Sequence, residues 1–147
     1  MNLQDLQAKV GENLGTSDWY EMGQDRINQF ADATEDHQYI HVDPEKAKNS
    51  PFGQTIAHGF LTMAMLAPFL EYGLPKIDAK MMVNYGFEKV RFLAPVKSGK
   101  RIRGHFKLLS LTEKRPGQWQ ATLEATVEIE GEEKPALIAE WVIQLFV

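Results

Sequence analysis

The residues from Asp36 to Leu70 read DHQYIHVDPEKAKNS and then PFGQTIAHGFLTMAMLAPFL, and this stretch decides how the chain is organised. Its last part, which begins at Gly59, is apolar nearly all round and carries no charged side chain. Such a pattern predicts a helix that is buried on most sides. Because Pro68 has no N–H to donate to the carbonyl of Ala64, we expect a kink or a tightened end at the proline.

The chain after this helix has the pattern of β-strands. Alternating or wholly apolar runs predict four long strands, over 81–92 with a bulge at Gly86, 101–108, 119–129 and 137–147. The last run is apolar on both faces apart from Glu140 and Gln144, which is typical of a central or interface strand. An antiparallel sheet of these strands could wrap around the buried helix, which makes the expected class α+β.

The chain before Asp36 predicts shorter elements. We expect a weak amphipathic segment over 3–14, a short strand within 16–22 and a helix over 24–33. After His41, Asp43 is a good N-cap and Pro44 suits the first position of a short helix that ends near Lys48.

Composition narrows the class of protein. The chain has 147 residues, 44% of them hydrophobic, which suits a single domain over 1–147. It has no cysteine, which excludes a thiol nucleophile, and its formal charge of −4 argues against nucleic acid as a partner. No signal-peptide pattern opens the sequence, and the longest apolar run is shorter than the ~20 residues that cross a bilayer. We therefore expect a cytoplasmic protein with no membrane partner.

Asp36 and His41 are five residues apart, in a stretch expected to be a loop. A carboxylate and an imidazole that face one cavity can hold a water molecule and exchange protons with it. The alternative is a surface aspartate and a histidine without a shared task, and the spacing by itself favours this alternative.

His37 and His41 have the spacing of two metal ligands on one helix face. Tyr39, Ile40 and Pro44 argue against a helix through both histidines, and no clear third ligand follows. We therefore expect no metal.

Gly59 is expected in the first turn of the buried helix, where its N–H has no partner within the helix. Such a donor can polarise a thioester carbonyl and stabilise the enolate formed from it. Close packing would explain the glycine equally well. His58 is expected to be a hydrogen-bonding residue beside the site. Lys89, Arg91, Arg101 and Arg103 could attract a phosphorylated carrier, although such charges more often form a solvated strand face.

Three segments together resemble the MaoC-like dehydratase family, which includes the (R)-specific enoyl-CoA hydratases and the nodulation-protein-N-like proteins. They are FADATEDHQYIHVDP at 30–44, FGQTIAHGFLT at 52–62 and NYGFEKVRFLAPV at 84–96, and the third is especially similar to the nodulation-protein-N-like branch. The resemblance covers nearly the whole chain. It implies a hot-dog fold, in which a twisted antiparallel sheet wraps a long central helix, usually in a homodimer.

The resemblance also implies a reaction, namely the hydration of a trans-2-enoyl-CoA to the (R)-3-hydroxyacyl thioester. The substrate would be an acyl-CoA or acyl-carrier thioester, with no metal or other cofactor. The family pattern makes Asp36 and His41 the catalytic pair and the Gly59 N–H the donor to the thioester carbonyl. The residues expected to orient these groups or line the pocket are Gln38, His58, Asn84 and Tyr85.

The chain departs from the motif Gly-Asp-x-Asn-Pro-x-His that many hydratases carry. It has Glu35 for the glycine, Gln38 for the asparagine and Tyr39 for the proline. Gln38 can still orient a neighbour by a hydrogen bond, whereas Tyr39 is bulkier than proline and is expected to narrow the pocket. Two other functions stay open: a hot-dog thioesterase that uses Asp36 near the carbonyl, and a non-catalytic acyl-CoA-binding subunit.

Overall fold

Four long strands form the body of the protein in a computed structural model that describes residues 1–147. They are β3 (Met81–Phe92), β4 (Arg101–Arg115), β5 (Gln118–Ile129) and β6 (Leu137–Phe146). Two short strands, β1 (Asn13–Thr16) and β2 (Tyr20–Glu21), both pair with β4. The sheet order is β1-β4-β5-β6-β3, and all the pairs are antiparallel. The four predicted long strands are thereby confirmed.

The sequence pattern explains the position of each strand. In β5 the apolar residues of the alternation, such as Leu123 and Val127, are buried, and the intervening Glu124 is exposed. In β6 both faces are buried from Trp141 to Leu145, and the strand pairs with β5 along one edge and with β3 along the other. The prediction of a central strand is therefore correct. The predicted bulge in β3 is also present, since the register shifts between Asn84 and Gly86.

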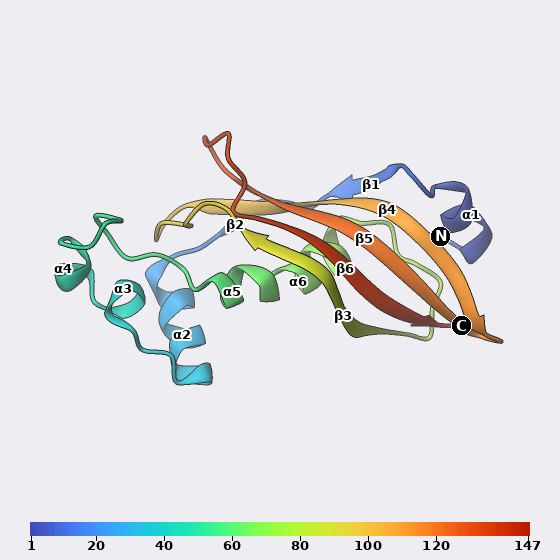
Figure 1. The fold of residues 1–147 in the computed structure, drawn as a ribbon, viewed down its shortest axis with the longest axis horizontal. Helices are drawn as coiled ribbons and strands as arrows, with labels where there is room; N and C mark the ends of the chain where they lie inside the picture. Colours follow the sequence, from blue (N-terminus) through green and yellow to red (C-terminus); the bar gives the residue numbers. More distant parts are fainter.

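Helices α5 (Gly59–Ala64) and α6 (Leu66–Gly73) lie against one face of the curved sheet (Figure 1). The kink expected from Pro68 is present, because the central helix breaks at Met65, three residues before the proline. The proline ring would collide with the carbonyl of Ala64 and cannot donate to it, so the helix yields at that point. Phe69 packs on Gly104, where a Cβ atom would lie 2.8 Å from the phenyl ring.

Three further helices gather at one end of the sheet, namely α2 (Gln24–Thr34), α3 (Tyr39–Val42) and α4 (Pro44–Ala47) (Figure 1). Asp43 caps α4 as predicted, since its carboxylate accepts from the Lys46 N–H at 3.1 Å.

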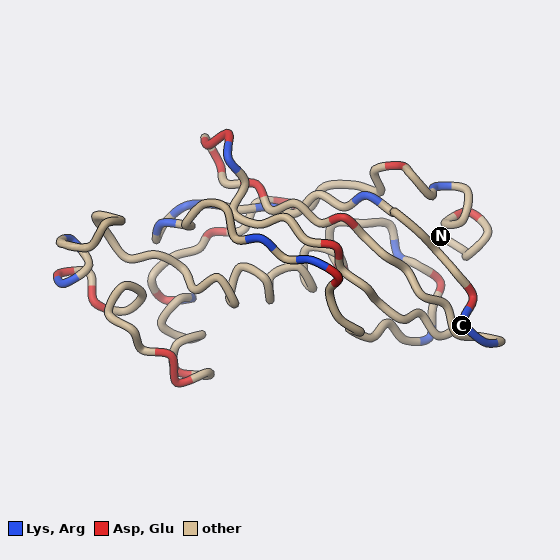
Figure 2. The backbone as a smooth tube through the Cα atoms, in the orientation of Figure 1, with Lys and Arg blue, Asp and Glu red and all other residues tan.

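At the other end α1 (Leu3–Ala8) is shorter than expected, because Leu14 lies in β1. No helix of the protein combines the length and apolar character that crossing a membrane requires. Figure 2 shows that the chain through α5 carries no Lys, Arg, Asp or Glu. The helix is nevertheless buried on one side only, through Leu61 and Thr62, while Phe60 is 66% exposed. The prediction of a helix buried on most sides is therefore wrong for the single chain, because the sheet covers one face of the helix.

Candidate active site

His41 lies in the short helix α3 rather than on the expected loop, and its side chain is buried. Its Nδ1 lies 2.7 Å from the carbonyl oxygen of Ile56. A carbonyl only accepts, so Nδ1 carries the proton and the lone pair of the neutral ring is on Nε2. Burial lowers the pKa of His41 below its ordinary value of 6.5, and the neighbouring His58 contributes to the decrease. His41 is therefore a neutral imidazole near pH 7 with a free proton acceptor.

His58 stacks on His41, with ring centroids 3.9 Å apart and an interplanar angle of 25°. Phe30 of α2 lies next to the same ring at 4.9 Å. The Nε2–H of His58 donates to the backbone carbonyl of Asp36 at 3.0 Å, so His58 joins the start of α5 to the segment that carries the acid. Its Nδ1 is buried without a hydrogen-bond partner. A buried acceptor of this kind is costly unless a water or a ligand satisfies it.

Asp36 follows directly on the end of α2, and it is more exposed than either histidine. The chain turns there because Glu35 adopts the left-handed conformation, with φ of 63°. This is a common helix C-terminal geometry that glycine adopts most readily, which explains why a glycine suits this position in the motif. One side-chain nitrogen or oxygen atom from each of Asp36, His41 and His58 lies within 4.8 Å of those of the other two. That separation is short enough for one water molecule to bridge the carboxylate and the imidazole.

The same three groups have the chemistry of metal ligands, but their arrangement does not fit a metal well. The histidine rings are nearly parallel, so the lone pairs of His41 and His58 lie in nearly parallel planes. The ligands of a tetrahedral ion instead converge on one point. His37 is outside the group, since its Nε2 bonds to Asp32 at 2.9 Å on the surface. The arrangement favours a water molecule between Asp36 and His41.

Gln24 and Thr55 hold His41 in place, and the sequence did not identify either of them. The Nε2 of Gln24 donates to the backbone carbonyl of His41 at 2.7 Å. Its Oε1 accepts from the buried Thr55 hydroxyl at 2.6 Å. These residues are far apart in the sequence, so no local motif could have indicated that they meet.

Gly59 is the first residue of α5, and the first hydrogen bond of that helix runs from the Thr62 N–H to the His58 carbonyl at 3.1 Å. The Gly59 N–H therefore has no partner within the helix, as expected. The glycine also allows close packing, because a Cβ atom would lie 3.0 Å from the ring of Phe92. Gly59, Thr62 and Phe92 line a cavity of about 310 Å³, so the peptide at the helix start borders space that a ligand can enter.

The other residues predicted for the site lie in different surroundings. The exposed Gln38 contributes its backbone N–H, which donates to the carboxylate of Asp36 at 3.4 Å. Asn84 lines two cavities beside α5 and α6. The side chain of Tyr85 is 70% exposed, so in the single chain it encloses no pocket. Tyr39 lies under the ammonium group of Lys46, 4.8 Å from its ring centre.

Of the four cations considered for a carrier, Arg101 and Arg103 pair with Glu130 and Glu128, and both lie over Trp19. These two arginines therefore belong to a charged strand face. Lys89 and Arg91 on β3 have no carboxylate partner.

Comparison with known proteins identifies the family of this chain. Residues 5–132 match the family described as MaoC like domain. The chain belongs to the MaoC-like family. Nodulation protein N of Rhizobium leguminosarum bv. viciae is 48% identical over 144 residues, which are 97% of this chain and 89% of that protein. The 3-hydroxyacyl-thioester dehydratase Z of Mycobacterium tuberculosis is 49% identical over 141 residues, which are 95% of this chain and 93% of the relative.

Solved structures of MaoC-like proteins share the fold. The (R)-hydratase from A. caviae superposes with a TM-score of 0.75 at 26% identity, covering 91% of this chain and 94% of that structure. A MaoC-like dehydratase from Rhodospirillum rubrum superposes with a TM-score of 0.81 at 24% identity, covering 99% and 97% of the two chains. The hot-dog fold implied by the sequence resemblance is therefore confirmed, with its central helix in two pieces.

Proposed function

We propose that this MaoC-like protein is a hydratase that adds water to a trans-2-enoyl thioester and catalyses the reverse dehydration. The observation that carries the proposal is the group formed by Asp36, His41 and His58, which bring one polar atom each within 4.8 Å of one another beside the start of α5. The names of the dehydratase Z and the (R)-hydratase support the same chemistry and an (R)-3-hydroxyacyl product.

The proton positions suggest how the water is activated. The carboxylate of Asp36 and the free Nε2 of His41 are both acceptors, so together they accept the two hydrogens of one water molecule. Its oxygen then attacks the β-carbon of the enoyl group while one acceptor takes a proton. The negative charge that develops on the thioester oxygen is met by the Gly59 N–H, and a proton delivered to the α-carbon completes the addition. Removal of one such donor typically costs ~3 kcal/mol of barrier.

The direct test uses crotonyl-CoA and follows the loss of absorbance of the enoyl thioester. Asp36→Asn keeps the size of the side chain but removes its basicity, and we expect kcat to fall by about 100-fold or more. Asp32→Asn is the matched control, because Asp32 bonds only to the surface His37 and should leave kcat unchanged. Equal turnover by wild type and Asp36→Asn would contradict the mechanism.

The same protein samples distinguish hydration from the two other functions. A thioesterase would release free CoA thiol, which a chromogenic thiol reagent detects, whereas hydration leaves the thioester intact. A non-catalytic subunit would bind acyl-CoA without either signal, and its Asp36 and His41 variants would bind normally. We expect hydration without thiol release.

We also propose a homodimer that forms along β3. This strand is twelve residues long, ends the sheet and carries exposed apolar side chains, including Met81, Tyr85 and Phe92. Such an edge usually pairs with another strand or is covered. A second copy would cover it and would enclose Tyr85 at the interface. Light scattering after size-exclusion chromatography should give twice the mass of one chain, and Tyr85→Arg should shift the protein toward the monomer.

A further inference from the structure

Trp141 of β6 separates two apolar cavities that follow helices α5 and α6. The first cavity has a volume of about 280 Å³, and its walls include Phe30, Phe60, Met63 and Phe87. The second has a volume of about 230 Å³ and is bounded by Leu70, Met82, Val83 and Ile143. Both are lined by the same three residues, Ala67, Asn84 and Trp141. The indole and its neighbours therefore form the wall between the cavities.

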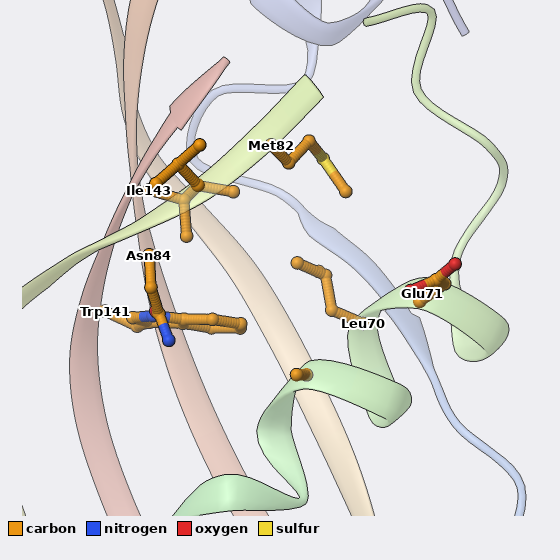
Figure 3. A pocket seen from close by; sticks show the side chains of 8 residues that line it. Leu70, Glu71, Met82, Asn84, Trp141 and Ile143 are labelled. Carbon is orange, nitrogen blue, oxygen red and sulfur yellow. The ribbon is translucent and has the colours of Figure 1, made fainter. Parts of the chain in front are cut away.

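The wall is held in one position. The indole Nε1–H of Trp141 donates a hydrogen bond to the side-chain carbonyl of Asn84, and the residue is only 4% exposed. Phe87 stacks on it with an interplanar angle of 12° and ring centroids 6.1 Å apart. Figure 3 shows the indole nearly edge-on, reaching from the sheet toward the helix, with Met82 and Ile143 on the side of the second cavity.

The first cavity comes within one side chain, that of Phe30, of the group that contains Asp36, His41 and His58. Phe30 is part of its wall, and the Phe30 ring lies 4.9 Å from His58, which stacks on His41. An acyl chain whose β-carbon is next to Asp36 and His41 could enter this apolar space past Phe30. Trp141 lines the space on the side of the second cavity.

We infer that Trp141, fixed by Asn84, sets the maximum length of the acyl chain, and that the unaltered protein prefers short chains. This inference rests on the proposed hydratase function. Opening the wall would join the second cavity to the first and nearly double the room for the chain. Each methylene group of the acyl chain that moves from water into the cavity should raise kcat/KM about fourfold, because the burial of apolar surface is favourable.

The test measures kcat/KM for crotonyl-CoA, trans-2-octenoyl-CoA and trans-2-dodecenoyl-CoA. The wild type should prefer crotonyl-CoA. Trp141→Leu should raise the ratio of dodecenoyl-CoA to crotonyl-CoA by at least about tenfold. Trp19→Leu is the matched control, since Trp19 lies under Arg101 and Arg103 away from both cavities, and its ratio should equal that of the wild type.

Asn84→Val provides a second route if Trp141→Leu does not fold. It retains the indole but removes its hydrogen-bond acceptor, so the ratio should move in the same direction by a smaller factor. A folded Trp141→Leu with the wild-type ratio, or an unchanged ratio in Asn84→Val, would overturn the inference while leaving the hydratase function intact. A wild-type protein that hydrates none of the three substrates would reject the hydratase function, and the inference with it.

Discussion

The sheet and the helical end of this protein are stabilised in different ways. The sheet from β3 to β6 is held by long ladders of backbone hydrogen bonds around an apolar core. The helical end has short helices, and a few bonds from side chains to backbone fix its reacting groups, such as those from His41 to Ile56 and from His58 to Asp36. The sheet thus provides stability by repetition, whereas the geometry of the site depends on single contacts. Substitutions in the two regions should have correspondingly different effects.

A core substitution in the sheet should give the largest effect on stability. Phe106 of β4 is completely buried, and Phe106→Ala should lower the free energy of unfolding by about 3–5 kcal/mol through the lost burial and the cavity left behind. Urea titration measures the loss, with the exposed neighbour Lys107→Ala as the control. The folded fraction should retain most of its turnover. A stable but inactive Phe106→Ala would contradict the division between the two regions.

Gln24→Leu should instead reduce turnover, with a smaller loss of stability. It removes the donor to the His41 carbonyl and the acceptor of the buried Thr55 hydroxyl, so about 1–3 kcal/mol of stability should be lost. We expect kcat to fall as well, because a displaced imidazole binds the water poorly. Gln29→Leu, at an exposed position of the same helix, is the matched control. Full activity of Gln24→Leu would show that His41 needs no such support.

Replacing Glu35 by glycine should change the stability by a smaller amount and in the opposite direction. Its φ of 63° places a non-glycine residue in the left-handed region, at a cost of about 1–2 kcal/mol. Glycine removes that cost but gives the unfolded chain more freedom, so Glu35→Gly should stabilise the protein by roughly 0.5–1 kcal/mol. Thermal unfolding measures the gain. Glu35→Ala, which keeps the strain, should show none, and an equal gain in both variants would point to the lost charge instead.

Two histidines of the helical end, His37 and His41, should have pKa values that are shifted in opposite directions. Burial lowers the pKa of His41, whereas the hydrogen bond to Asp32 raises the pKa of the exposed His37. NMR titration of the ring signals should therefore give values below and above 6.5 for His41 and His37 respectively, and the reverse order would refute the assignment. Because folded His41 binds its proton less readily than the unfolded chain does, its contribution to stability should decrease as the pH falls through 6.5. The acidic limb of kcat/KM should lie below 6.5 for the same reason.

Much of the fold could be predicted from the sequence because the strands follow a local rule. The alternation in β5 determines which residues face the core and which face solvent. The run that is apolar on both faces indicated β6, and patterns of this kind indicated all four long strands. The prediction was wrong where distant contacts prevail. Leu14 joins β1 because the distant strand β4 offers that segment a pairing partner. The break of the central helix at Met65 is a local effect of Pro68, and the sequence predicted it.

The sequence by itself determined the family and pointed to Asp36, His41 and Gly59. Only the tertiary structure decided which nitrogen of His41 is free, because the Ile56 carbonyl that accepts a hydrogen bond from Nδ1–H is fifteen residues away. It also decided that Gln24 and Thr55 meet behind His41 and that Trp141 divides the space along the helices. The physical reason is that proton positions, burial and cavity walls depend on which distant groups the fold brings together.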